Sequence, residues 1–141
     1  MADTATRLRN FLKSNAAVKQ RLGERIYFNR APTFEGKPYL YYRRVTADNP
    51  DTLDATAGED CYSELFEVEV VSNVEAEAEA IADLIIKDDN SGLAMSDYRG
   101  TFDDTTVRGI FVTNRESSHT PLGIGETTGL WSVAFNAEVH L

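Results

Sequence analysis

The segment VEAEAEAIADLIIK, residues 74–87, restricts the possible folds more than any other part of the 141-residue sequence. Its apolar residues recur at three- and four-residue spacing, which predicts an amphipathic helix. The apolar face holds Val74, Ala78, Ile81 and Ile85, with Leu84 beside them. Glu75, Glu79 and Asp83 face outwards, and Asn73 is placed to cap the N-terminus. Such a helix needs an apolar surface to pack on, and the neighbouring strands supply one.

Strands are predicted on both sides of this helix. Residues 62–72 alternate, with Phe66, Val68 and Val70 on one face and glutamates on the other. The final segment also alternates, and its inward row is Trp131, Val133, Phe135, Ala137, Val139 and Leu141. Further strands are expected at 25–28 and 106–114. The aromatic segment 39–45 is typical of a strand that is covered on both faces.

The first 22 residues predict two short helices. An apolar stripe in the first helix is formed by Ala5, Leu8, Phe11 and Leu12. Asn15 is a suitable N-cap for the second helix, and Gly23 lies where that helix should end. The expected fold is therefore a single α+β domain over residues 1–141. A twisted, largely antiparallel sheet of four to five strands carries the helical pair and the helix at about 74–87 on one face.

Two connections are predicted to be long, at about 46–60 and 114–129. Loops above ~12–15 residues are uncommon in compact domains unless they are functional or disordered. The first is acidic and contains Asp48, Asp51, Asp54, Glu59 and Asp60. The second combines polar residues with aliphatic ones, which fits contact with another protein and a flexible hairpin tip about equally well. Its candidate interface residues are Arg115, Glu116, His119, Leu122 and Ile124.

Composition argues against several classes of protein. The net charge of −9 disfavours tight nucleic-acid binding, which relies on clustered Lys and Arg, although an acidic balance also simply keeps a protein soluble. The single cysteine, Cys61, excludes a disulfide within the chain. No apolar run approaches the ~20 residues of a membrane span, and the N-terminal residues lack a signal peptide's apolar core. A reduced, cytosolic protein is expected.

No motif predicts catalysis, a metal site or a cofactor site. His119 and His140 have no nearby partner that would form a triad or a zinc site. GIGETTG at 123–129 lacks the spacing of a dinucleotide-binding loop and precedes a strand rather than a helix. DDNSG at 88–92 lacks the glutamate at position twelve of a calcium loop. The sequence predicts neither an enzyme nor a cofactor-binding protein.

The layout as a whole resembles the tail completion, or tail terminator, family of tailed bacteriophages and related gene-transfer particles. The resemblance covers nearly the whole chain and rests on five stretches in order: LRNFLKSNAAVKQRLGERIYFNRAP, KPYLYYRRV, ELFEVEVVSNVEAEAEAIADLI, VRGIFVTNRESS and GLWSVAFNAEVHL. None is a catalytic motif. The acidic segment 46–60 and the long loop 114–129 depart from the family pattern, and these departures leave the subunit contacts undefined.

The resemblance implies a structural virion protein, assembled in the bacterial cytoplasm, that forms a ring, typically a homohexamer, at the head-proximal end of the tail tube. The ring ends tube polymerisation and joins the tail to the head connector. The implied partners are other copies of the chain, the tail tube protein and a connector or stopper protein. DNA passes through without specific binding, no membrane is involved, and no catalytic or cofactor residues are carried over.

Other functions stay open at this point. A small acidic inhibitor or immunity-type protein would mask a basic partner such as a nuclease, in a salt-sensitive one-to-one complex rather than a ring. A head-side stopper or adaptor protein differs little from a terminator in sequence. A small hydrolase would need a pocket that contains a carboxylate of raised pKa.

Overall fold

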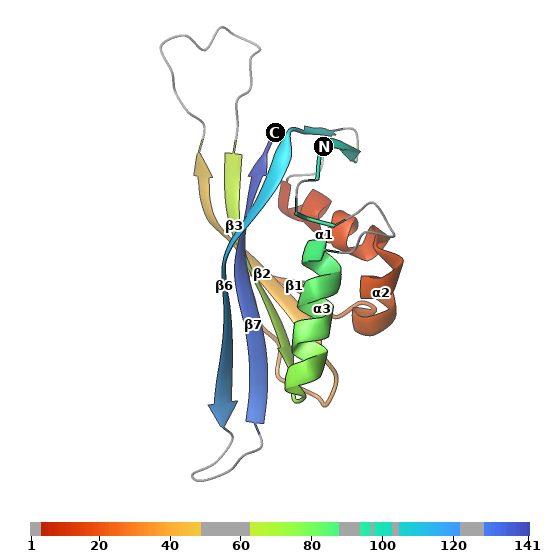
Figure 1. Cartoon of the computed structure of the whole chain (residues 1–141), viewed down its shortest axis with the longest axis vertical. Helices are drawn as coiled ribbons and strands as arrows, with labels where there is room; N and C mark the ends of the chain where they lie inside the picture. The colour runs from red at the N-terminus through yellow and green to blue at the C-terminus, as the bar shows by residue number, and fades with distance from the viewer. Residues whose placement is uncertain (1–3, 49–62, 88–93, 97, 103–104, 122–128) are drawn as a thin grey trace, which may run out of the picture.

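The computed structural model describes residues 4–48, 63–87, 94–96, 98–102, 105–121 and 129–141 (Figure 1). Its helices are α1 (Thr4–Ser14), α2 (Ala16–Leu22) and α3 (Glu75–Lys87). Its strands are β1 (Ile26–Phe28), β2 (Tyr39–Asp48), β3 (Ser63–Ser72), β4 (Gly100–Phe102), β5 (Thr105–Val107), β6 (Gly109–Pro121) and β7 (Gly129–His140).

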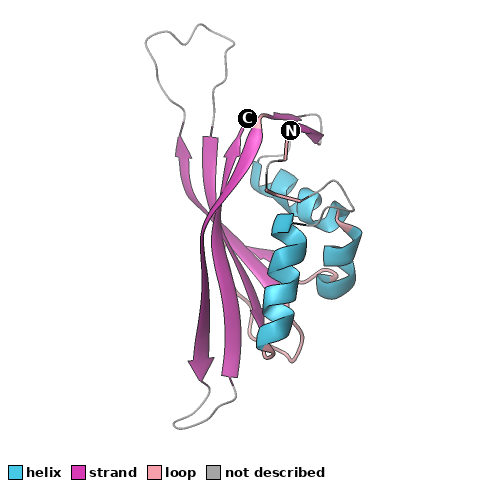
Figure 2. Cartoon of the chain, in the orientation of Figure 1, coloured by secondary structure: helices cyan, strands magenta, loops and turns pink. Residues whose placement is uncertain are grey.

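Five of the strands form one sheet in the order β1-β2-β3-β7-β6. Only the β1–β2 pair is parallel, and the other pairs are antiparallel. The helices lie together on one face of this sheet (Figure 2). Strands β4 and β5 form a separate two-stranded sheet. The sequence pattern did not predict β4, and the strand predicted at 106–114 is divided at Arg108 between β5 and β6. The predicted α+β class with a largely antiparallel sheet is confirmed.

The N-terminal helices form as their apolar stripe and caps predict. Ala5, Leu8, Phe11 and Leu12 are all buried. The Asn15 side-chain oxygen accepts hydrogen bonds from the backbone N–H groups of Ala17 and Val18, at 3.1 and 3.3 Å. Its amide nitrogen donates to the Leu84 carbonyl at 3.3 Å, so the N-cap of α2 also ties that helix to α3. Gly23 follows α2 with φ 57°, a conformation that L side chains seldom adopt.

Helix α3 packs over β3 and β7 through its buried residues, Ala78, Ile81, Ala82, Ile85 and Ile86. Two details of the prediction are wrong at its N-terminus. Val74 is 49% exposed, because the helix begins one residue later, at Glu75. The side chain that binds the start of the helix belongs to Ser72 rather than Asn73. Its hydroxyl accepts from the Val74 N–H and donates to Glu77 Oε1.

The core lies between the helices and one face of the sheet. Phe66, Val68 and Val70 on β3 are fully buried, and so is most of the predicted β7 row. The prediction that β2 is covered on both faces is wrong for much of its length. Tyr39 is buried beside the rings of Tyr27 and Phe34, but Val45 is 43% exposed. The helices occupy a single face, so the other face is open to solvent along most of the described sheet.

A buried ion pair lies at the end of the core near α1. Glu64 of β3 is 2% exposed, and its Oε1 atom lies 2.8 Å from Arg44 Nε on β2. The Arg44 guanidinium also lies over the Phe66 ring, 5.7 Å from its centroid. Nearby, the Tyr42 hydroxyl donates to the Ala5 carbonyl at 2.6 Å and so connects β2 to α1. The Tyr42 hydrogen bond therefore adds a polar contact to the apolar packing between α1 and the sheet.

Candidate functional site

The predicted loop 114–129 is mostly strand in the structure. Strand β6 continues to Pro121 and pairs with β7 as far as Gly129, so Arg115, Glu116 and His119 lie on a strand. Their polarity does not prevent strand formation, because β7 pairs with one edge of this terminal strand and both faces of this part of the hairpin reach solvent. Leu122 and Ile124 lie outside the described residues. Figure 1 shows β6 and β7 as a long hairpin that forms one side of the molecule.

A β-bulge in β6 decides which face each of these residues occupies. The register shifts between Thr113 and Glu116, and Asn114 has φ 55°, in the left-handed region that Asn tolerates better than most residues. Before the bulge, the even-numbered residue Ile110 faces the helices and is buried. After it the odd-numbered residues face the helices, because one extra residue reverses the alternation.

The bulge brings Arg115 onto α3. Its guanidinium lies 2.5 Å from Glu79 Oε2 and 2.7 Å from Asp83 Oδ1. The Ser117 hydroxyl donates to the other oxygen of the Glu79 carboxylate. Hydrogen bonds from Ser117 and then Arg115 lower the pKa of Glu79 below its ordinary value. We call these four residues the hairpin brace: they hold the polar half of β6 against α3 through charge rather than apolar packing.

Glu116 lies on the opposite, open face. There it lines a hollow of about 290 Å³ together with Glu67, Asn114, Asn136 and Ala134. The hollow exists because Ala134 is small and the bulge displaces the β6 backbone. Glu67 on the far side is paired with Arg43, whose guanidinium lies 2.9 Å away. No ion pair joins Glu116 to another residue in the described part of the chain.

His119 faces the helix side near the turn of the hairpin. Its ring stacks on Trp131 of β7, with 4.2 Å between centroids and 29° between planes. The Nε2 atom is buried and has no hydrogen-bond partner among the described residues. His140, the other histidine, lies 2.9 Å from Glu138. The two histidines therefore occupy separate parts of the sheet.

The acidic segment begins on a strand, since Asp48 is the last residue of β2. Asp51, Asp54, Glu59 and Asp60 lie outside the described residues, as does Cys61. The sequence pattern missed the hairpin brace, because Arg115 is more than 30 residues from its partners on α3. The outward stripe of α3 was visible in the sequence, but its partner strand was not.

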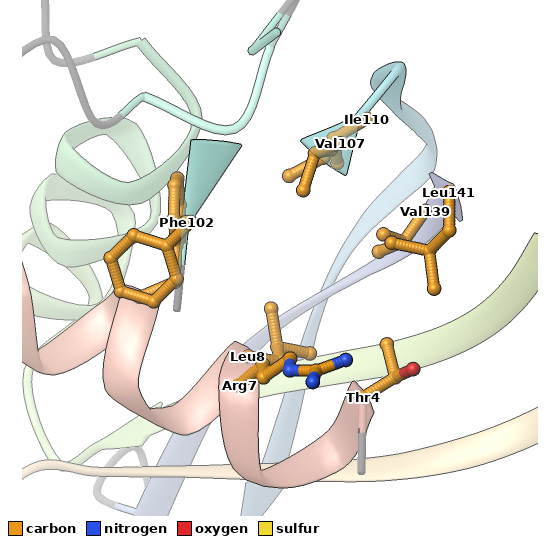
Figure 3. Close-up of a pocket in the computed structure, with 9 residues that line it drawn as sticks. Thr4, Arg7, Leu8, Phe102, Val107, Ile110, Val139 and Leu141 are labelled. Carbon is orange, nitrogen blue, oxygen red and sulfur yellow. The ribbon is translucent and has the colours of Figure 1, made fainter. Parts of the chain in front are cut away.

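The cavity beside α1 is too small for a typical substrate. An apolar cavity of about 30 Å³ lies between α1, the β6–β7 end and Phe102, with Arg7 and Thr4 at its rim (Figure 3). Substrate pockets usually measure ~300–1,000 Å³ and contain converging polar groups. No three His, Cys, Asp or Glu side chains in the described ranges are grouped so that they could hold a metal ion. Within those ranges no helix is both long and apolar enough to cross a membrane.

Comparisons with known proteins show which folds and which family this chain resembles. A chain in the virion of a native gene transfer agent particle has a similar fold: the alignment covers 95% of this chain and 92% of that one, with a TM-score of 0.60 and 14% identity. A second solved chain aligns over 99% of this chain and 98% of its own with 15% identity, but its TM-score of 0.48 is too low to carry an argument. Among proteins of curated function, none matches. The model of the family described as "Tail completion protein gp17" matches residues 6–123, and the chain therefore belongs to that tail completion family.

Proposed function

We propose that this chain forms a homohexameric ring at the head-proximal end of the tail tube, where it ends tube polymerisation and joins the tail to the head connector. The observation that carries the proposal is the family match over residues 6–123. Residues 1–141 act as one tail-terminator-like domain, and the role is structural rather than enzymatic. The protein assembles in the bacterial cytoplasm and ends as part of the virion.

The sheet has the asymmetry that such a ring requires. A ring is built from heterologous contacts, in which each subunit presents two different, complementary surfaces. The two ends of this sheet differ, because β1 is a three-residue strand and β6 is a thirteen-residue strand. Each copy therefore has two distinct sides for its neighbours, and the two ends of the ring remain for the tube protein and the connector or stopper protein.

The β6–β7 hairpin is the element that we assign to partner contacts. Arg115 acts within the subunit as part of the hairpin brace, and it sets the position of the hairpin. We assign the contacts themselves to Glu116 on the open face, to His119, and to Leu122 and Ile124, which lie outside the described residues. These are the residues whose substitution should separate assembly from folding.

We assign the acidic segment to the channel through which DNA passes. Carboxylates repel the phosphate backbone, so DNA slides past without binding. In the variant that tests this assignment, Asp48, Asp51, Asp54, Glu59 and Asp60 are replaced by the matching amides. Slower DNA ejection from otherwise normal particles would support the assignment, and unchanged ejection would count against it.

The experiment that tests the ring's role is deletion of the gene, followed by negative-stain microscopy of the particles. Filled heads beside unattached, abnormally long tails are expected, because nothing then stops the tube. Unattached tails of normal length would favour a head-side stopper or adaptor instead. Fully joined, normal particles would contradict the proposal and turn attention to an inhibitor of a basic partner. Complementation with the wild-type gene is the control.

A further inference from the structure

The net charge of −9 conceals a strong segregation of charge along the chain. Residues 1–48 contain ten of the fourteen Lys and Arg residues but four of the 23 Asp and Glu residues. Residues 49–141 contain the remaining four basic and nineteen acidic residues. Charge asymmetry between the two parts of a chain points to interaction surfaces of opposite sign.

The fold carries the basic part to one end of the sheet. Helix α2 packs beside β1, where Val18 and Leu22 share the core with Ile26 and Leu40. Four exposed basic residues lie on α2 and on the connection from β1 to β2: Lys19, Arg21, Arg30 and Lys37. None of the four forms an ion pair with another described residue. We call this group the basic edge.

The acidic part reaches the other end of the sheet. Glu75, Glu79 and Asp83 repeat every four residues along α3, and the hairpin brace places this stripe beside β6, the terminal strand. Like charges at this spacing destabilise a helix. Among the described residues, Arg115 pairs with two of the three carboxylates, Glu79 and Asp83. The three residues on the helix side of β6, together with Glu116 on its open face, form what we call the acidic edge. In the described part of the chain, these four carboxylates outnumber the cationic side chains that pair with them.

We propose that the basic edge of one copy docks on the acidic edge of the next, head to tail. The proposal rests on the proposed ring function and names the surfaces that would close the ring. Neighbouring strands are spaced ~4.8 Å, so five strands separate the two edges by about 19 Å. Both edges are therefore free to bind different neighbours at once, as a closed ring requires.

Side-chain charge, rather than a continuous strand ladder, provides the contact. The bulge at Asn114 and the proline at the end of β6 interrupt the outer edge of that strand, and both features discourage edge-to-edge pairing. An interface that depends on exposed charges weakens as salt screens them. Assembly of the isolated protein should therefore be favoured by low ionic strength.

Charge-reversal variants test the proposal. One variant carries Lys19→Glu and Arg21→Glu on the basic edge, and the other carries Glu75→Lys and Glu116→Lys on the acidic edge. The four residues form no ion pairs with described residues, so folding should survive, as circular dichroism would verify. Assembly is measured by sedimentation velocity and native mass spectrometry over a series of salt concentrations. Each variant alone should associate at least about tenfold more weakly than the wild type, because like charges then meet.

Mixing the two variants gives the decisive readout. Each reversed edge then meets a reversed partner, and each unchanged edge meets an unchanged one, so rings of alternating copies should form again. Arg99→Glu and Glu69→Lys are matched controls, since Arg99 lies outside both edges and Glu69 lies on the internal strand β3 without an ion pair to another described residue. Both controls should assemble like the wild type.

A wild-type chain that remains monomeric at every salt concentration overturns the edge contact, and so does a folded mixture that fails to assemble. These failures are distinct from failure of the proposed function. Unjoined tails after gene deletion, with no assembly in solution, would support the terminator role and contradict the edge contact. Charge-dependent assembly in solution, with normal particles after deletion, would support the edge contact and contradict the terminator role.

Discussion

The two faces of the sheet differ in the interactions that their side chains make. The helix-covered face is apolar: Phe66, Val68 and Val70 lose all contact with solvent there. The open face of the same strand carries Glu67 and Glu69 at alternate positions, and Glu67 pairs with Arg43 across the strands. Burial of apolar area supplies most folding free energy, whereas exposed ion pairs supply little. One face therefore holds the fold together, and the other is available for contacts.

The largest expected effect comes from an apolar ring on the covered face. Phe135→Ala should lower the free energy of unfolding by about 3–5 kcal/mol, since it removes a 1% exposed ring and leaves a cavity. Phe111→Ala is the matched control on β6, where the ring is 49% exposed and lies against His140. Urea unfolding measures both variants. Equal losses would show that the open face is also covered in the folded protein.

The second test compares two glutamates of one strand. Glu64→Ala removes the buried partner of Arg44 and should cost about 1–3 kcal/mol, less than a fully buried pair because Arg44 is a third exposed. Glu67→Ala breaks the solvent-exposed pair with Arg43 on the other face and should leave the unfolding midpoint nearly unchanged. Denaturant unfolding measures the stability of both variants. A larger loss of stability in the Glu67 variant would contradict the contrast between the two faces.

A smaller effect is expected at the cap that joins two helices. Asn15→Ala removes the N-cap of α2 and its hydrogen bond to Leu84, and it should cost about 1–2 kcal/mol. Asn15→Ser would keep an N-cap oxygen, but its shorter side chain would not reach the Leu84 carbonyl on α3. Thermal unfolding should therefore rank the wild type first, the Ser variant second and the Ala variant last. A Ser variant as stable as the wild type would show that the bond to Leu84 contributes nothing.

The smallest effect concerns the hairpin brace and depends on pH. The folded-state pKa of Glu79 lies below its unfolded value, so its contribution to stability is fully present above that unfolded value, about 4.5. The contribution is lost as pH falls through the lowered folded-state pKa. The stability difference between wild type and Glu79→Gln should therefore shrink on acidification. Glu75→Gln, on the same helix but without a contact to β6, is the control, and an equal pH dependence in both variants would contradict the brace.

The sequence by itself determined the local elements and the covered face. The stripe of α1, the cap at Asn15 and the alternation of β3 and β7 depend on neighbours within a few residues, so their patterns are legible without the fold. The family resemblance depended on the same stretches and is confirmed by the match over residues 6–123.

The tertiary structure alone decided how far β6 extends and what its polar half contacts. Residues 114–121 contain a run of polar side chains that is typical of a loop, yet pairing with β7 makes them a strand. One extra residue at Asn114 reverses the alternation and turns Arg115 towards Glu79 and Asp83. The apolar pattern does not show where a bulge lies, and an ion pair between distant segments has no characteristic spacing in the sequence. For these reasons the hairpin brace and the two charged edges become visible only when the sheet is assembled.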